Sequence, residues 1–373
     1  MAQAVTNGCI SGDGQFTLAC ANLLEATFEI KKVLMTPSCT AALEMAAILC
    51  EFEPGDEVIM PSYTFVSTAT AFVREGATPV FVDIRPDTLN IDEKLIEESI
   101  TPRTKAIVVV HYAGVACEMD TIMRIAEKHN LIVIEDAAQG VNSFYKGRAL
   151  GSIGHVGCYS FHETKNYICG EGGALCINDA EMIERAEIIR DKGTNRQRFF
   201  RGQVDKYTWV DVGSSYVPSE ISCAFLFAQL ELLDEIAKVR KSRYQFYQEQ
   251  LENLAATANI ELPQIPEACT SNFHMFYVLL ESFEARCELI EQLKRNRIQA
   301  VFHYIPLHSS PASMDRGFFT RPLPVTDSVS SRLLRLPFFH DITFVEQQRV
   351  VDSLVSFFDP AESIDMQTEK SLR

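Results

Sequence analysis

Between Val58 and about Ile177 the chain repeats one pattern, in which short apolar runs rich in valine and isoleucine alternate with segments of helical period. Continuous apolar runs of this length are typical of strands that are buried on both faces. Amphipathic segments such as 119–129 lie between them, so we expect an α/β fold with a mainly parallel sheet. A mixed sheet fits the pattern equally well. The predicted strands are 57–61, 79–83, 106–111, 131–136, 157–161 and 174–178.

Apolar residues return at helical spacing after this region. Residues 183–190 predict one helix and residues 219–251 a second, long one. The stripe expected to face the core of the long helix consists of Ile221, Ala224, Phe225, Ala228, Leu232, Ile236 and Val239.

A smaller α/β pattern follows Pro263 and Pro266. We therefore predict a large domain over 1–235, which carries the main sheet, and a smaller C-terminal α/β domain over 236–373. The elements expected in the smaller domain are strands at 275–280 and 300–304 and helices at 287–297 and 344–358.

The charge and cysteine content exclude several classes of protein. The 373 residues carry 34 Lys and Arg against 50 Asp and Glu, a net charge of −16, which argues against a nucleic-acid partner. No basic segment followed by an apolar run opens the chain, and no stretch approaches the roughly 20 apolar residues of a membrane span. The 11 cysteines include no CxxC pair and no zinc-ligand spacing. We expect free thiols in a reducing, cytoplasmic compartment, without a metal or a membrane partner.

Two reactive side chains follow the ends of predicted strands, where parallel α/β sheets place ligand sites. Asp136 ends an apolar run, so its carboxylate is expected to be desolvated and to need a cationic or hydrogen-bonding partner. A helix N-cap is an equally weighted role for Asp136 on position alone. Lys165 precedes the glycine-rich turn 170–173, where an amine of lowered pKa suits Schiff-base chemistry, although most lysines are simply solvated.

The segment 37–43, PSCTAAL, places small residues at the start of an apolar helix. Such a helix start offers N–H groups and a positive dipole end to a phosphate, and the alternative is an ordinary Ser/Thr cap. A phosphate site, a carboxylate for a protonated ring nitrogen and a lysine for an imine are together what pyridoxal 5′-phosphate (PLP) requires. We therefore predict PLP as the cofactor, with Lys165 also moving protons.

Several motifs together resemble the DegT/DnrJ/EryC1/StrS nucleotide-sugar aminotransferases, in the right order over nearly the whole chain. They are PSCTAAL at 37–43, PSYTFVSTA at 61–69, VHYAG at 110–114, EDAAQG at 135–140, YKGRALGSIG at 145–154, SFHETKN at 160–166, GEGG at 170–173 and VFHYIPLH at 301–308. The resemblance implies the aspartate aminotransferase fold (fold type I) and a homodimer with active sites at its interface. The sugar 3-dehydratases of this group carry histidine in place of Lys165, so transamination is favoured over dehydration.

The resemblance also implies roles for single residues. Lys165 would form the imine with PLP, Asp136 would pair with the pyridine nitrogen, Gln139 would contact the ring-hydroxyl side, and Phe65 would stack on the ring. Many relatives use an asparagine to reach the phosphate across the dimer interface, and here Ser215 stands at that position. The phosphate would be held by Thr40, Ala41 and Ser160.

Basic residues gather between Arg190 and Lys206, where six of them accompany only two acidic residues. In a chain of this net charge they are the best candidates for binding the diphosphate of a nucleotide sugar, and a solvated helix end is the alternative. A second polar cluster follows the predicted strand 300–304, where a structural role for His308 is equally weighted. The predicted substrate residues are Arg190, Arg196, Arg201, His303, Tyr304 and His308.

The stretches SFHETKNY at 160–167 and DKGTNRQRFFRGQVDKYTW at 191–209 are similar to those of family members that make a sugar of enterobacterial common antigen. This implies ping-pong transfer of an amino group from L-glutamate to the 4-keto carbon of dTDP-4-keto-6-deoxy-D-glucose. The products would be dTDP-4-amino-4,6-dideoxy-D-galactose and 2-oxoglutarate. Amination at C3 and formation of the C4 epimer remain open. A non-catalytic PLP-binding regulator is the alternative of another class, and an intact lysine, aspartate and phosphate site argue against it.

Overall fold

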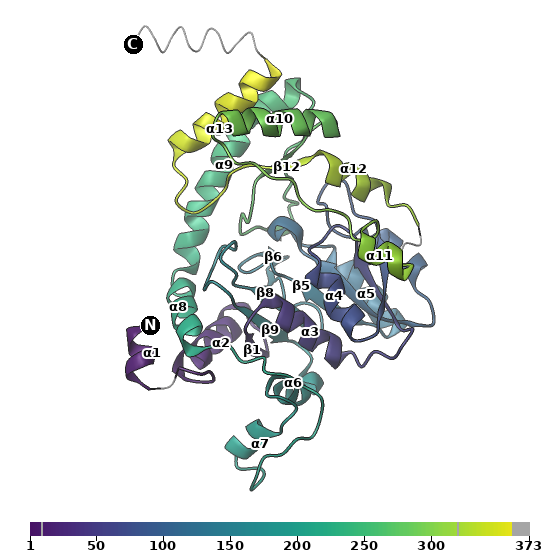
Figure 1. The fold of residues 1–373 in the computed structure, drawn as a ribbon, viewed down its shortest axis with the longest axis vertical. Coiled ribbons are helices and arrows are strands. Elements are labelled where there is room, and N and C mark those ends of the chain that lie inside the picture. Colours follow the sequence, from purple (N-terminus) through teal and green to yellow (C-terminus); the bar gives the residue numbers. More distant parts are fainter. Residues whose placement is uncertain (9, 319–320, 360–373) are drawn as a thin grey trace.

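The structure is a computed structural model that describes residues 1–8, 10–318 and 321–359. Residues up to helix α8 (Glu220–Leu230) build a seven-stranded sheet with helices on both faces, here called the sheet unit (Figure 1). The rest, from α9 (Leu233–Thr257) onward, has its own hydrophobic core around a two-stranded sheet and is called the C-terminal unit. The predicted domain boundary at residue 235 falls in the first turn of α9 and stays a prediction.

The large sheet has the strand order β1-β9-β8-β5-β4-β2-β3. Five neighbouring strands, from β8 to β3, are parallel, and β9 runs antiparallel to both β8 and β1. The predicted α/β fold with a mainly parallel sheet is therefore confirmed. The strands are β1 (Lys32–Thr36), β2 (Glu57–Pro61), β3 (Thr78–Val82), β4 (Thr104–Val110), β5 (Ile132–Asp136), β8 (Val156–Ser160) and β9 (Gly173–Ile177). A small separate sheet joins β6 (Phe144–Tyr145), β7 (Arg148–Ala149) and β10 (Cys269–Thr270).

The two faces of the large sheet belong to separate hydrophobic cores, because side chains alternate along each strand. In β4, Ile107 and Val109 pack with α2, α5 and α8, whereas Val108 packs with α3, α4 and α6. Since helices cover both faces, consecutive positions inside the strands are apolar, which explains the apolar runs. The helices of this unit are α1 (Ala2–Thr6), α2 (Gln15–Phe28), α3 (Cys39–Leu49), α4 (Ser67–Arg74), α5 (Met119–His129), α6 (Ile183–Arg190), α7 (Arg196–Phe200) and α8.

All six strands predicted for the large sheet form, within one or two residues of their expected ends. Helices α5, α6 and α13 (Phe344–Phe358) have the predicted bounds. Strand β1 was not predicted. It runs at the edge of the sheet, where it pairs antiparallel with β9, about 140 residues later in the chain, and a local pattern carries little sign of so distant a partner.

The single long helix predicted over 219–251 is wrong, because the chain breaks it into α8 and α9 at Leu232, whose φ is −109°. The helical spacing of apolar residues continues through the break, and neither glycine nor proline marks it. The predicted buried stripe is also wrong in part. Helix α8 packs on α2 through a different stripe, which consists of Cys223, Leu226 and Leu230. The exposed members of the predicted stripe are Ile221, Phe225, Ala228 and Leu232.

In the C-terminal unit, β11 (Tyr277–Leu279) pairs antiparallel with β12 (Leu333–Arg335). The predicted strand at 300–304 does not form, because His303 and Tyr304 pack against Tyr112 of the sheet unit, and only Val301 makes a bridge with β12. The remaining helices are α10 (Phe283–Arg295), α11 (Pro311–Arg316) and α12 (Pro324–Arg332). Within the described residues, no helix is both long enough and apolar enough to cross a membrane.

Candidate active site

A cavity of about 600 Å³ opens at the carboxyl ends of the parallel strands, between the sheet unit and the C-terminal unit. Val110, Asp136 and Ser160, the last residues of β4, β5 and β8, line it from one side. This is the edge at which parallel sheets place their ligands. The cavity brings together eight of the predicted site residues, namely Thr40, Phe65, Asp136, Gln139, Ser160, Lys165, His303 and Tyr304.

Asp136 is 5% exposed, and its carboxylate accepts hydrogen bonds from Thr68 Oγ1 at 2.7 Å and from the Ala138 N–H at 3.2 Å. The described residues that follow it form turns, so Asp136 does not cap a helix. Burial raises the pKa of Asp136, while the hydrogen bonds from Thr68 and Ala138 and the charge of Lys165 lower it in part. A buried carboxylate of this kind favours a cationic partner.

Thr68 orients Asp136 and is not among the predicted site residues. The hydroxyls of Thr64 and Thr68 are 2.7 Å apart. Since Thr68 gives its only proton to Asp136, Thr64 must be the donor to Thr68. Thr64 precedes α4 and Thr68 lies in its first turn, and the two form a relay that ends at the carboxylate. The available signal was their presence in the segment PSYTFVSTA.

Lys165 lies in a turn after β8 that is closed by a hydrogen bond from its own N–H to the His162 carbonyl at 2.9 Å. Burial lowers the pKa of Lys165 and the charge of Arg335 adds to this effect, whereas Cys39 and Asp136 act in the opposite direction. A lowered pKa increases the fraction of neutral amine, which is the nucleophilic form in imine chemistry.

The predicted phosphate site is the N-terminus of α3. Ser38 caps this helix, since its Oγ accepts the Ala41 N–H at 3.1 Å, and Ala41 itself is buried and does not line the cavity. Thr40 does line the cavity, with its Oγ1 2.8 Å from Ser67 Oγ, and Ser160 lies across from them at the end of β8. Three hydroxyls beside a helix start suit an anion.

Gly173, the first residue of β9, sets the position of this helix start. A Cβ at Gly173 would lie 2.4 Å from the Ser38 carbonyl carbon and 2.5 Å from the Cys39 nitrogen. Only glycine therefore allows β9 to approach α3 so closely.

Gln139 is fixed at both ends of its side-chain amide. Its Oε1 accepts the Ala113 N–H at 2.6 Å, and its Nε2 donates to the Tyr304 hydroxyl at 3.0 Å. Tyr304 also lies against Phe65, with ring centroids 6.3 Å apart. Phe65 is 56% exposed at the cavity, so its ring is available for stacking on a bound aromatic group.

His303 lines the cavity beside Tyr304, and its Nδ1 is 3.0 Å from the Tyr112 hydroxyl. Burial lowers the pKa of His303 to about 2, and the charges of Arg335 and Lys165 contribute to this. His303 is therefore a neutral hydrogen-bonding group at neutral pH.

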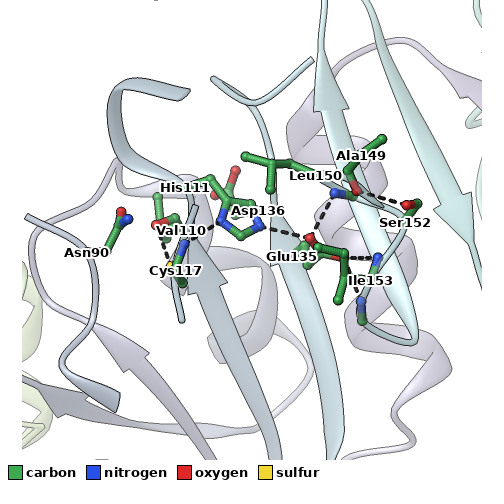
Figure 2. Close-up of polar contacts among 12 residues, drawn as sticks. Asn90, Val110, His111, Cys117, Glu135, Asp136, Ala149, Leu150, Ser152 and Ile153 are labelled. Carbon is green, nitrogen blue, oxygen red and sulfur yellow. Dashed lines mark hydrogen bonds and ion pairs between the residues drawn. The ribbon is translucent and has the colours of Figure 1, made fainter. Parts of the chain in front are cut away.

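A fully buried hydrogen-bonded pair lies beneath the cavity. His111 Nε2 is 2.8 Å from Glu135 Oε2, and neither side chain is exposed. His111 Nδ1 accepts the Cys117 N–H at 3.2 Å, so Nε2 carries the proton that is donated to Glu135. Figure 2 shows this pair beside Asp136, the next residue along β5. Glu135 also accepts N–H groups of the loop that follows β7, at 2.8, 2.7 and 2.6 Å from Gly151, Ile153 and Gly154.

The predicted arginines lie outside the cavity, and each is paired with a carboxylate of the same chain. Nearby carboxylates therefore neutralise the expected excess of positive charge, and some of these carboxylates come from residues distant in the sequence. Their role in substrate binding stays a prediction. The pairs are Arg190 with Asp13 at 2.5 Å, Arg196 with Asp191 at 3.4 Å and Arg201 with Glu187 at 2.8 Å.

His308 also lies outside the cavity. It is 2% exposed, with its Nδ1 2.7 Å from Ser62 Oγ and its Nε2 3.4 Å from Asp327. This environment favours the structural alternative for His308.

The donor set of the cavity fits PLP. Hydroxyls and a helix start suit its phosphate, Asp136 suits its ring nitrogen, and Lys165 suits its aldehyde. Two further residues, His274 and Arg335, line the cavity and were not predicted, because no motif contains them and only the packing of the C-terminal unit brings them here.

Comparisons with known proteins agree with this chemistry. The sequence model of the DegT/DnrJ/EryC1/StrS aminotransferase family matches residues 1–355. The chain is similar to the spore coat polysaccharide biosynthesis protein SpsC of Bacillus subtilis, with 33% identity over 87% of this chain and 85% of that protein. It also resembles the crystal structure of a DegT DnrJ EryC1 StrS aminotransferase from Brucella abortus, with 29% identity, a TM-score of 0.87, and 96% and 94% of the two chains covered. Helicobacter pylori PseC, an aminotransferase of pseudoaminic acid biosynthesis, is 25% identical, with a TM-score of 0.85 over 96% and 94% of the chains.

Proposed function

The chain belongs to the DegT/DnrJ/EryC1/StrS aminotransferase family and is a PLP-dependent sugar aminotransferase of fold type I, and from this premise we propose its substrates. L-glutamate gives its amino group to the 4-keto carbon of dTDP-4-keto-6-deoxy-D-glucose. The products are dTDP-4-amino-4,6-dideoxy-D-galactose and 2-oxoglutarate.

One observation carries the assignment of the site: Lys165 and the buried Asp136 line the same cavity as the hydroxyls at the start of α3. Bound PLP supplies an electron sink for the carbon that loses or gains the amino group. Asp136, fixed by Thr68, keeps the ring nitrogen protonated, and Phe65 covers the ring. Lys165 holds the cofactor at rest and afterwards carries the proton on its Nζ.

The choice of sugar is supported by the resemblance of residues 160–167 and 191–209 to family members that make dTDP-4-amino-4,6-dideoxygalactose. His303 and Tyr304 line the cavity as neutral hydrogen-bonding groups, which suits sugar hydroxyls and a keto oxygen. The C4 epimer of the product, or amination at C3, would require a different presentation of the sugar to the same lysine.

A substrate panel tests this proposal. The PLP-loaded protein is incubated with L-glutamate and, separately, with dTDP-linked 4-keto-6-deoxyglucose and a 3-keto isomer, and each product is identified by NMR. We expect an axial amino group at C4 of a galactose-configured product. An equatorial C4 amine, or turnover of the 3-keto sugar alone, would contradict the proposed substrate and product.

The working form is a homodimer in this proposal. The arm that contains α7 and the residues up to 212 extends from the sheet unit (Figure 1) and carries exposed apolar side chains. Exposed aromatic residues on an extended arm favour a protein interface. The most exposed apolar side chains of the arm are Phe200 at 60%, Trp209 at 77% and Val212 at 56%.

A further inference from the structure

The two residues that follow Lys165 attach its turn to the C-terminal unit. Asn166 is 9% exposed, and its side chain bonds to residues 272–274, here called the junction segment, which lead into β11. The Tyr167 hydroxyl donates to the carbonyl of Leu233, the first residue of α9, at 3.2 Å. The turn that carries the reactive lysine therefore contacts the C-terminal unit at two places.

The hydrogen bonds of Asn166 fix the orientation of its side-chain amide. Its Nδ2 donates to the Asn272 carbonyl at 2.8 Å, because a carbonyl can only accept. The Oδ1 is therefore the group that lies 2.9 Å from His274 Nδ1, and this nitrogen carries the proton. Burial, with the charges of Lys165 and Arg240, keeps the pKa of His274 well below its ordinary value, so the ring has this one proton. Both ends of the amide are thus committed to the junction segment.

The junction segment is itself held in an unusual conformation. Phe273 has a φ of 53°, in the left-handed region that a phenylalanine seldom adopts. Arg240, 5% exposed, donates to the Phe273 carbonyl at 3.0 Å and to the His274 carbonyl at 2.5 Å. The Asn272 side chain donates to the Val141 carbonyl at 2.7 Å. Because such a backbone persists only where its surroundings fix it, the segment is a rigid support for the lysine turn.

The other bonds of the turn are local. The Lys165 N–H closes it onto the His162 carbonyl at 2.9 Å, and His162 Nδ1 is 2.9 Å from Oγ1 of the exposed Thr164. A lysine side chain is long and flexible, so its amine reaches a defined position only when the backbone that carries it is fixed. A displacement of about 1 Å in a reacting group can lower a rate by about a hundredfold.

We propose that Asn166 is a positioning residue for Lys165, which it holds in the cofactor site by fixing the lysine turn to the junction segment. The proposal rests on Lys165 as the reacting amine and does not depend on the choice of keto sugar. Since the support belongs to the C-terminal unit, a displacement of that unit also moves the lysine turn.

Asn166→Ser removes both bonds, and Asn253→Ser, at an exposed site on α9, is the matched control. In the cofactor-free protein, the extent of reductive methylation of Lys165 is measured by mass spectrometry over a range of pH. Burial lowers the pKa of Lys165, so a loosened turn that admits water should raise it toward the ordinary value. We expect this rise in Asn166→Ser and not in Asn253→Ser. A wild-type titration of Lys165 in Asn166→Ser would overturn the proposal.

The PLP-loaded protein gives a second readout, in single turnover with L-glutamate and with its C2-deuterated form. We expect the rate of Asn166→Ser to fall by about a hundredfold. The isotope effect should grow, because the proton that Lys165 carries then limits the step. The dissociation constant of 2-oxoglutarate should stay within about twofold of wild type. Weaker binding at an unchanged rate would show that Asn166 shapes the ligand site and would overturn the proposal.

Variants of His274 separate its bond to Asn166 from a direct contact with a ligand. His274→Asn retains an N–H donor near the position of Nδ1, whereas His274→Leu has none. We expect a smaller loss of single-turnover rate in His274→Asn than in His274→Leu. Equal losses would assign the effect to Nε2 of His274 at the cavity and contradict the role of Asn166.

Asn166→Asp keeps the test decisive if Asn166→Ser is too unstable to purify. It retains an acceptor for His274 Nδ1 and loses the donor to Asn272, so an intermediate single-turnover rate is expected. A wild-type rate in Asn166→Asp and in Asn166→Ser would overturn the proposal. A wrong choice of keto sugar would leave all these results unchanged, because none of the measurements uses a sugar.

Discussion

At the scale of single residues, the site depends on two groups whose pKa values burial shifts in opposite directions. Burial raises the pKa of Asp136 and lowers that of Lys165, so both neutral forms are favoured when the cavity is considered alone. The charge of Asp136 therefore depends on its hydrogen bonds, above all on the one from Thr68 at 2.7 Å. This makes Thr68 a positioning residue that acts through Asp136.

Thr68→Val removes that hydrogen bond while it keeps the shape of the side chain. The pKa of Asp136 is expected to rise further, because the lost hydrogen bond stabilises the carboxylate. The affinity for PLP should fall by tenfold or more, on the basis of about 1.5–3 kcal/mol for a hydrogen bond to a charged group. The acid limb of the kcat profile should also move to higher pH. Thr70→Val, an exposed change on the same helix, is the control, and an unchanged acid limb in Thr68→Val would contradict the role of Thr68.

At the scale of elements, the buried pair of His111 and Glu135 joins three segments beneath the cavity: the end of β4, β5 and the loop after β7 (Figure 2). Burial raises the pKa of Glu135, but the hydrogen bonds from His111 and the loop amides outweigh it and hold the pKa below its ordinary value. Because Asp136 is the next residue of β5, this pair fixes the strand that carries the carboxylate facing the cofactor site.

Glu135→Gln places an amide NH₂ against several backbone N–H groups, so we expect the free energy of unfolding at pH 7 to fall by about 3–5 kcal/mol. A carboxyl whose pKa is lower in the folded state stabilises above its unfolded pKa, and this contribution disappears as the pH falls through the folded pKa. The difference between wild type and variant should therefore shrink below about pH 4. Urea unfolding at pH 7 and at a pH below about 4 measures this difference in the free energy of unfolding. The exposed Glu127→Gln is the control. A difference that does not depend on pH would contradict a charged Glu135.

At the scale of the whole molecule, the sequence predicted what local patterns encode and missed what distant packing decides. Strands buried on both faces produce apolar runs, and the reactive Lys165 and Asp136 lie at or after strand ends. The sheet and these two central residues of the site could therefore be predicted from the sequence. Arg335 reaches the cavity only because the C-terminal unit folds over the sheet edge. The carboxylates that neutralise Arg190 and Arg201 were likewise hidden, since an ion pair leaves no periodic trace in the sequence.

The proposed homodimer predicts a concentration-dependent change in mass when the exposed arm loses its apolar side chains. In a sedimentation experiment, the mass of the double variant Phe200→Ser, Trp209→Ser should fall from that of two chains to that of one. Large aromatic residues dominate the energetics of interfaces. Phe283→Ser, at a site 50% exposed on α10, is the control and should leave the mass unchanged. A double variant that stays dimeric at micromolar concentration would place the interface elsewhere.

The most direct test of the account is the chemical identity of the lysine that holds PLP. The loaded protein is reduced with borohydride, and the modified peptide is identified by mass spectrometry. We predict the label on Lys165. In Lys165→Ala both the label and the visible absorbance of the bound cofactor should be lost, with no measurable turnover, whereas the exposed Lys146→Ala should behave as wild type. A label on another lysine, or transamination by Lys165→Ala at the wild-type rate, would contradict the account.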